Sequence, residues 1–280
     1  MGWLLEIVHE TRVRYQGLAR ASYNEARMTP LTLSTQSALQ TRVTVGGGTA
    51  VWAYPDYWGT LVSSFDIQAP HEELTVRAHS MVETSGAAPV PPALDWAELR
   101  ARADAGLAAE YLTATPRTTV QPGLAAAARE RTAGADPVRA AAEIAAWVAG
   151  RVAYVPGATG VQTSAQEAWD QGQGVCQDIA HLTVALLREA GLPARYVSGY
   201  LHPRPEAGIG QVTAGQSHAW VEYWVGRWAA ADPTNQAPVG ECHVVVARGR
   251  DYADVPPLKG VYHGAPSMAM DVSVEVTRLA

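Results

Sequence analysis

Residues 174–192 read GVCQDIAHLTVALLREAGL and predict a helix that starts at its cysteine. Ile179 and Leu182 begin an apolar stripe at helical spacing, which favours packing of this helix against a core. A helix N-terminus has free N–H groups and a partial positive charge, and both favour the thiolate form of Cys176. A free cysteine is by itself more often a small buried hydrophobe, so its surroundings decide between the two interpretations.

Two further reactive side chains follow along the chain. His218 opens an alternating run that predicts a half-buried strand, and Asp232 ends the short run after it. A thiol, an imidazole and a carboxylate in this order are the parts of a cysteine nucleophile with its base and its orienting group. Asn235 is the alternative orienting group, as in Cys-His-Asn sites, and Asp232 is favoured because it carries the charge.

The hairpin that carries His218 and Asp232 must place both side chains on one face of the sheet. A two-residue loop would put Asp232 opposite Val221, on the wrong face. A three-residue loop pairs Trp224 with Trp228 and makes His218 and Asp232 diagonal neighbours, about 7 Å apart at the backbone. We therefore predict an odd loop or a bulge here.

These segments resemble the transglutaminase-like superfamily. The helix start at residues 174–181 and the stretch 186–200 look like its nucleophile helix and following strand, and residues 218–222 and 232–235 match its two other signature strands. The resemblance also includes the β-rich domain that precedes this core in bacterial members, through residues 8–11, 22–30 and 71–76. It thus extends over nearly the whole chain and implies a papain-like core, with the nucleophile helix packed on an antiparallel sheet.

The predicted fold class is α+β, in three parts. Residues 1–85 are strand-like and predict a β-sandwich-like N-terminal domain. Residues 86–135 form a Pro-rich linker followed by helices, the first of them over 95–110. Residues 136–280 form the catalytic core, in which helices precede an antiparallel sheet and an alternating strand over 268–276 comes last.

Local signals set the expected elements of the core. Asp136 and Pro137 are an N-cap and a first-turn proline for a helix that ends near residue 152. Ser164 and Glu167 form a capping box for a short helix. Strands are expected at residues 194–201, 217–225, 228–232 and 243–247. The long Pro- and Gly-rich loop between residues 200 and 216 is expected to line or cover the acyl site.

The expected activity is acyl transfer through a thioester, with Cys176 as nucleophile, His218 as base and Asp232 as orienting group. The backbone N–H of Cys176 is one oxyanion donor. The resemblance implies a second donor from a side chain upstream, for which Tyr154 is the first candidate and Trp169 the second, core packing being the alternative for each.

The substrate is expected to be a peptide, isopeptide or glutamine side-chain amide. Hydrolysis, as in a cysteine protease or amidase, is preferred because bacterial relatives with a β-rich N-terminal domain look more like such enzymes. A glutamine-crosslinking transamidase and an inactive binding scaffold are the alternatives.

Three neighbouring residues have other expected roles. Asp178 is expected to cap the helix start, with substrate contact as the alternative. His181 lies about 140° around the helix from the thiol and cannot be its base. Glu222 shares the face of His218 as either a partner of the site or a sheet-face charge.

The composition excludes several classes of function. The net charge of −6 gives no basic field for nucleic acid or anionic membrane. The N-terminus lacks a signal-peptide pattern and no apolar run approaches a membrane span, so a cytoplasmic location is expected. No cofactor or metal is expected, because the Cys and His residues that could bind zinc lack the paired spacing that is typical of zinc sites. Those residues are Cys176, His181, His218, Cys242 and His243. The oligomeric state stays open.

Overall fold

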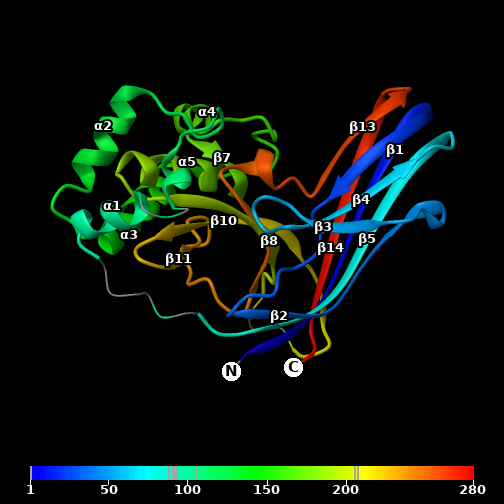
Figure 1. Cartoon of the computed structure of the whole chain (residues 1–280), viewed down its shortest axis with the longest axis horizontal. Helices are drawn as coiled ribbons and strands as arrows, with labels where there is room; N and C mark the ends of the chain where they lie inside the picture. The colour runs from blue at the N-terminus through cyan, green and yellow to red at the C-terminus, as the bar shows by residue number, and fades with distance from the viewer. Residues whose placement is uncertain are drawn as a thin grey trace.

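Two antiparallel sheets, a short parallel pair of strands and a group of helices make up the α+β fold, which confirms the predicted fold class (Figure 1). The computed structural model describes residues 2–87, 89, 94–104, 106, 108–204, 206 and 208–280. The helices gather over the smaller sheet, and the larger sheet stands beside them with both chain termini at one of its ends. No helix within these ranges is long and apolar enough to cross a membrane.

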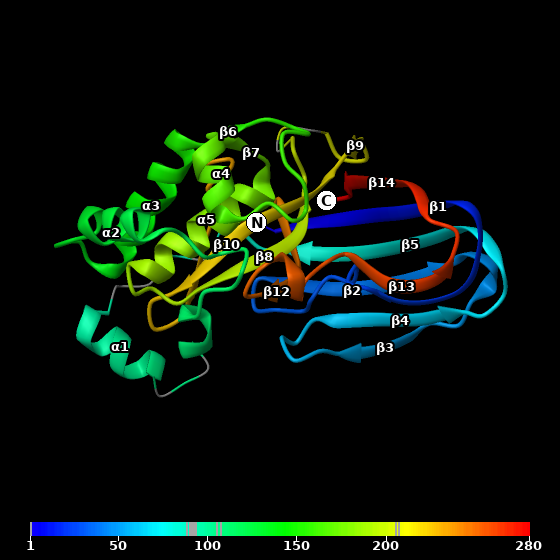
Figure 2. The same ribbon diagram turned by 90° about the horizontal axis from the view of Figure 1, so that it is seen from above.

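The larger sheet is organised around the 24-residue strand β1 (Trp3–Ala26). Its first half pairs with β5 (His71–Thr84) and β14 (Ser267–Arg278), and its second half pairs with β4 (Leu61–Ile67) and β13 (Leu258–Gly264). The pairing registers shift where these two halves meet, so the sheet bends there (Figure 2). The outer strands are β2 (Gln36–Val45), β3 (Trp52–Pro55), β9 (Val212–Ala214) and β13.

The bent sheet encloses an apolar cluster of its own. Phe65 of β4 and Val76 of β5 belong to this cluster together with Tyr15 and Met28. This bent sheet contains the β-rich N-terminal part that the sequence predicts, but it is one sheet, to which β9, β13 and β14 also belong.

Strands β13 and β14 differ from the prediction. The alternation over residues 268–276 predicts a strand of the catalytic part, but both strands pair with β1. The alternation of β14 identifies it as a strand without identifying its partner, and the long β1 offers a free edge along its whole length. The limits at residues 85 and 135 remain a prediction.

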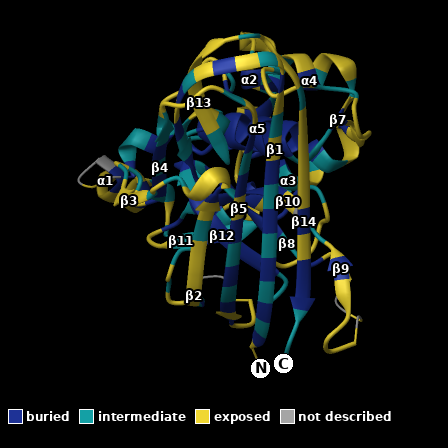
Figure 3. Ribbon diagram, turned by 90° about the vertical axis from the view of Figure 1, so that its right-hand side faces the viewer, coloured by how far each residue is buried: buried dark blue, intermediate teal, exposed yellow. Residues whose placement is uncertain are grey.

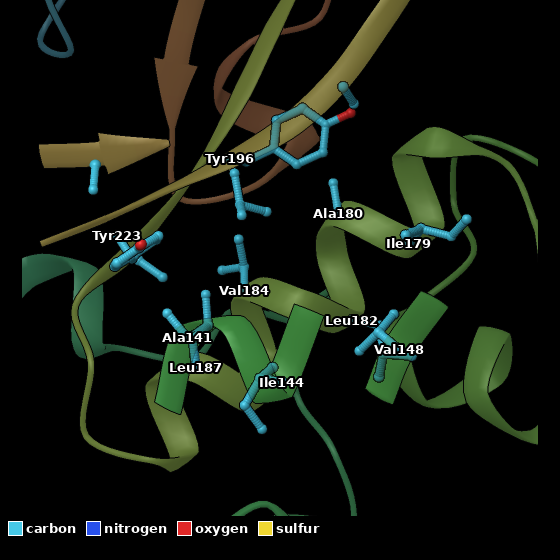
Figure 4. Packing of buried hydrophobic residues seen from close by; sticks show 14 of the residues in the cluster. Ala141, Ile144, Val148, Ile179, Ala180, Leu182, Val184, Leu187, Tyr196 and Tyr223 are labelled. Carbon is cyan, nitrogen blue, oxygen red and sulfur yellow. The ribbon is translucent and has the colours of Figure 1, made fainter. Parts of the chain in front are cut away.

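The smaller sheet has the strand order β11-β10-β8-β12. Its strands are β8 (Ala194–Leu201), β10 (Gln216–Trp224), β11 (Trp228–Ala231) and β12 (His243–Gly249), close to the predicted limits. The helix α5 (Cys176–Glu189) packs on this sheet with almost every side chain buried (Figure 3). Ala180 and Val184 face the sheet near Tyr196, while Leu182 lies against Val148 (Figure 4).

The other helices surround α5. They are α1 (Trp96–Asp104), α2 (Pro122–Arg131), α3 (Pro137–Arg151) and α4 (Ala165–Gln171), with short 3₁₀ turns at Gly46–Gly48, Ala109–Leu112 and Tyr252–Asp254. The side chain of Asp136 accepts hydrogen bonds of 3.0 Å from two N–H groups at the start of α3. Ser164 and Glu167 form the capping box of α4. Both predicted helix starts are confirmed.

Candidate active site

The start of α5 presents Cys176 beside a buried carboxylate. Asp178 accepts hydrogen bonds from the N–H of Val175 at 2.8 Å and from the hydroxyl of Thr159 at 2.5 Å. Burial raises the pKa of Asp178, and these hydrogen bonds oppose the rise. A Cβ on Gly174 would lie 2.9 Å from the Asp178 carboxylate, so glycine is needed here. Asp178 therefore holds the helix start in place, as the capping interpretation predicts.

The hairpin of β10 and β11 brings His218 and Asp232 together. Trp224 pairs with Trp228 across a three-residue loop in which Gly226 has a φ of +95°. The predicted odd loop is therefore confirmed. Nε2 of His218 lies 2.8 Å from Oδ2 of Asp232, and both side chains are almost fully buried. A short contact between buried groups of this kind is a charge-assisted hydrogen bond.

The electrostatics of the site favour an imidazolium. Burial acts to lower the pKa of His218, but its hydrogen bonds to Asp232 and Cys176 raise that pKa to about 9. Burial also opposes ionisation of Asp232, but hydrogen bonds from His218 and His243 hold its pKa well below the usual range. Because Nε2 of His218 binds Asp232, Nδ1 is the nitrogen available to Cys176. The arrangement can support a thiolate–imidazolium pair.

Asn235 assists Asp232 and does not take its place. The side-chain N–H₂ of Asn235 donates to Oδ2 of Asp232 at 2.7 Å. Oδ1 of Asp232 accepts from the backbone N–H groups of Thr234 and Asn235 at 3.1 Å each. The same amide nitrogen lies 3.2 Å from Nε2 of His218. Asn235 therefore contacts both members of the pair.

His243 is a second imidazole at Asp232, whereas its sequence position suggests only a zinc ligand. Its Nε2 lies 3.2 Å from Oδ2 of Asp232, and its Nδ1 accepts from the N–H of Gly240 at 3.4 Å. The atoms of His218, Asp232 and His243 that could bind a metal ion lie within 4.8 Å of one another. The two nitrogen–oxygen distances are those of hydrogen bonds, so we interpret the cluster as a proton-bonded network. No local sequence pattern identifies this role, because β12 reaches Asp232 only through the sheet.

A pocket of about 340 Å³ opens over Cys176 and His218. Tyr154 lines it, because the two-residue strand Ala153–Tyr154 pairs with Gln173–Gly174 just before the cysteine. Burial and the nearby Cys176 raise the pKa of Tyr154, so its hydroxyl stays protonated. Tyr154 therefore lines the pocket as a neutral phenol, and its role as an oxyanion donor remains a prediction.

Trp169 does not lie in the pocket. Its ring contacts Trp147 at 5.0 Å between centroids and stacks under Arg151, within the core beneath α5. The proposal of Trp169 as an oxyanion donor is wrong, and core packing, the alternative, is its role.

The loop between residues 200 and 216 is also placed differently from the prediction. None of its described residues lines the pocket, because residues 212–214 form β9 and pair with β14. Residues 212–214 gain backbone hydrogen bonds by pairing with the edge of β14, and this pairing holds them away from the pocket. The larger sheet instead supplies His9, Thr11, Met270 and Val272 to the pocket wall. His9 and Thr11 lie in a segment quoted above only for its resemblance.

Three other residues belong to the surrounding structure. His181 is fully buried, accepts from the N–H of Tyr252 at 3.1 Å, and burial lowers its pKa to about 3. Glu222 forms ion pairs with Arg195 and Arg248 away from the pocket, which makes it a sheet-face charge. Burial raises the pKa of Cys242 to about 11.

Comparison with known proteins identifies the family. Residues 125–233 match the transglutaminase-like superfamily, and residues 5–83 match the bacterial transglutaminase-like N-terminal region. An uncharacterised protein of Mycobacterium leprae is 44% identical over 99% of this chain and 100% of its own length. The chain belongs to the transglutaminase-like superfamily.

Two other proteins are similar to this superfamily member, one in part of its sequence and one in its fold. A protein-glutamine gamma-glutamyltransferase of Pseudomonas aeruginosa is 38% identical over 29% of this chain and 13% of its own length. The crystal structure of a candidate cysteine protease from Cytophaga hutchinsonii superposes with a TM-score of 0.74 at 22% identity, covering 100% of this chain and 93% of that one. This superposition shows a shared fold for the whole chain.

Proposed function

We propose that this superfamily member is an enzyme that cleaves amide bonds through a thioester on Cys176. The observation that carries the proposal is the buried 2.8 Å contact of His218 with Asp232, with Cys176 on the other side of the imidazole. An inactive scaffold has no need of a buried imidazolium, which costs solvation free energy unless a carboxylate compensates.

The first half of the reaction forms the thioester. The Cys176 thiolate attacks the amide carbonyl carbon, a C–S bond forms and the carbonyl electron pair moves to oxygen. The backbone N–H of Cys176, free at the helix start, and the hydroxyl of Tyr154 stabilise this oxyanion. As the C–N bond breaks, Nδ1 of His218 gives its proton to the departing amine.

The second half releases the acyl group. Water enters, His218 takes its proton, and the resulting hydroxide oxygen displaces Cys176 as a thiolate. Asp232 keeps the imidazole in one orientation throughout, and Asn235 and His243 hold Asp232. The acceptor preferred here is water. The similarity of the fold to that of a candidate cysteine protease supports hydrolysis.

Transamidation is the second candidate, because residues of this chain are 38% identical to part of a protein-glutamine gamma-glutamyltransferase. An amine would then replace water in the second half, with the same thioester before it. The triad alone does not favour either acceptor.

Trapping the acyl-enzyme tests the proposal. The protein is incubated with a panel of short fluorogenic peptide amides and glutamine-containing peptides, quenched in acid, and measured by intact mass. We expect a hydroxylamine-sensitive adduct on Cys176 and none in Cys176→Ala. Adding glycine methyl ester then distinguishes the acceptors, since amide formation in place of acid release indicates transamidation. Absence of any adduct across the panel, with Cys176 unreactive toward peptide electrophiles, would overturn the proposal.

A further inference from the structure

The outer edge of β14 is unpaired beside the active-site pocket. β9 pairs with β14 only at residues 275–277, and the N–H of Gly215 donates to the carbonyl of Val274 at 2.9 Å. In the part of β14 before Val274, no strand within the described ranges pairs with this edge. Figure 3 shows this part of β14 exposed at the side of the sheet, while its C-terminal end is buried.

The direction of the backbone groups on this edge follows from the pairing. The carbonyl of Val274 points outward, toward Gly215. In a strand, residues two apart direct their N–H and C=O groups to the same side. The N–H and C=O groups of Val272 and Met270 therefore also point outward, toward the open edge.

The same two residues line the pocket that contains Cys176. Met270 is 62% exposed and Val272 is 50% exposed. Tyr154 and Val161, both also about half exposed, line the pocket as well and come from the helical part of the chain. An open backbone edge and an apolar wall thus run directly into the site of Cys176.

We propose that the substrate binds as an extended polypeptide segment that pairs with the outer edge of β14 at Met270 and Val272, continuing the position that β9 and Gly215 occupy farther along. This proposal rests on the function proposed above. An extended main chain is the occupant because it alone presents N–H and C=O groups at the strand repeat and reaches from the edge into the pocket. The enzyme would then select unfolded or flexible segments.

Peptide electrophiles test this pairing on the intact protein. Cys176 is alkylated with iodoacetamide, with acetyl-alanine chloromethyl ketone, and with the tetrapeptide reagent acetyl-Ala-Val-Ala-Ala chloromethyl ketone, and rates are measured by intact mass. We expect the tetrapeptide to react faster than the single residue, by about three- to tenfold for each main-chain hydrogen bond gained. N-methylation of each internal amide in turn should remove this gain at alternate positions only, because paired strands alternate.

Variants of β14 give a second measure, the ratio of the tetrapeptide rate to the single-residue rate. Val272→Pro removes the outward N–H without removing a hydrogen bond to β1, and we expect the ratio to fall toward one. Val272→Ala keeps the backbone and should retain most of the ratio. Asp271→Ala changes an exposed side chain next to the edge and is the matched control.

The two proposals fail in different ways. N-methyl effects without alternation, or a ratio unaffected by Val272→Pro in a folded variant, overturn the β14 pairing alone. Iodoacetamide alkylation of Cys176 that does not depend on His218 overturns the proposed function.

Discussion

At the scale of single residues, the site depends on how buried charges are balanced. Asp232 accepts hydrogen bonds from two imidazoles, two backbone N–H groups and the Asn235 amide. A carboxylate with so many donors stays ionised although it is buried. Its charge in turn keeps His218 protonated, which is the condition for a thiolate at Cys176 near neutral pH.

Cys176→Ala should abolish acylation while the protein stays folded, because the half-buried thiol contributes little to the core. Hydrolysis of the peptide amide that acylates the wild-type protein measures the first effect, and the melting temperature measures the second. Cys242→Ala, a change at the other half-buried thiol, is the control and should retain activity. A melting temperature lowered by many degrees together with residual turnover would indicate a structural cysteine.

The pH profile of thiol alkylation should reveal the ion pair without a known substrate. We expect iodoacetamide to modify Cys176 substantially at pH 6, and Cys242, whose pKa burial raises to about 11, to stay slow. In His218→Ala the reaction of Cys176 at pH 6 should become slow. A wild-type profile that matches an ordinary thiol and does not change in His218→Ala would falsify the activated-thiol assignment.

Acyl transfer itself should decline as pH rises through about 9. His218 has a raised pKa, so its imidazolium is present below that value and is lost above it. The protonated ring is the acid for the departing amine, and kcat/KM for peptide amides therefore falls on the alkaline side. Asp232→Asn should move this decline to lower pH, because the charge that raises the pKa of His218 is gone.

The variants around Asp232 should differ in severity. In a serine triad the equivalent Asp→Asn change lowers kcat by about 10⁴-fold, and we expect a loss of that order for Asp232→Asn. Asn235→Ala and His243→Gln should cost less, with the alkaline limb of the pH profile shifted, because they act through Asp232. If Asn235→Ala proves more damaging than Asp232→Asn, the orienting group is misassigned.

At the scale of elements, the register of one hairpin decides whether the site exists. The three-residue loop after β10 sets Val221 opposite Ala231 and so directs His218 and Asp232 to the same face. Because side chains alternate, a shift of one residue reverses the face of every side chain on β11. The helix start adds the second condition, since Asp178 and Gly174 position Cys176 toward that face.

Inserting one glycine after Arg227 should abolish turnover with little loss of secondary structure. A three-residue loop made of Gly226, Arg227 and the added glycine then sets Val225 opposite Trp228, which turns Asp232 away from His218. Activity and far-ultraviolet circular dichroism measure the result. Insertion of one glycine after Gly47, in the exposed turn at Gly46–Gly48, is the control and should keep activity. Retained activity in the variant with the insertion after Arg227 would mean that a four-residue loop preserves the register.

At the scale of the whole molecule, the two sheets share one core. Leu5, Ile7 and Val276 of the larger sheet belong to the same buried cluster as Ile179 and Leu182 of α5. The hydroxyl of Tyr200, on β8, lies 2.9 Å from Nδ1 of His9 on β1. The larger sheet is thus a wall of the site as well as a support for it.

Separating the parts should therefore destroy both fold and reactivity. A fragment of residues 86–257 lacks β1, β13 and β14. It therefore exposes the apolar residues of the shared core that these strands cover, and it should be insoluble or molten. Sedimentation and alkylation at pH 6 measure this, with the full chain as control. A soluble fragment whose Cys176 keeps its reactivity would show that the core folds alone.

Local sequence determined much of this protein because the relevant signals lie within a few residues. Asp136, the Ser164–Glu167 capping box and the α5 stripe define their helices. His218 and Asp232 can meet only if they share one face of the sheet, and this requirement predicts the odd loop between their strands. The order of Cys176, His218 and Asp232 along the chain identifies them as the candidate triad.

Only the tertiary structure decided which distant groups meet. β14 pairs with β1, and residues 212–214 pair with β14. His243 contacts Asp232, and Tyr154 lines the pocket whereas Trp169 does not. Each of these contacts depends on strand edges or faces that lie far away along the chain. A strand pattern states that backbone groups need partners, and the completed sheet determines where those partners are.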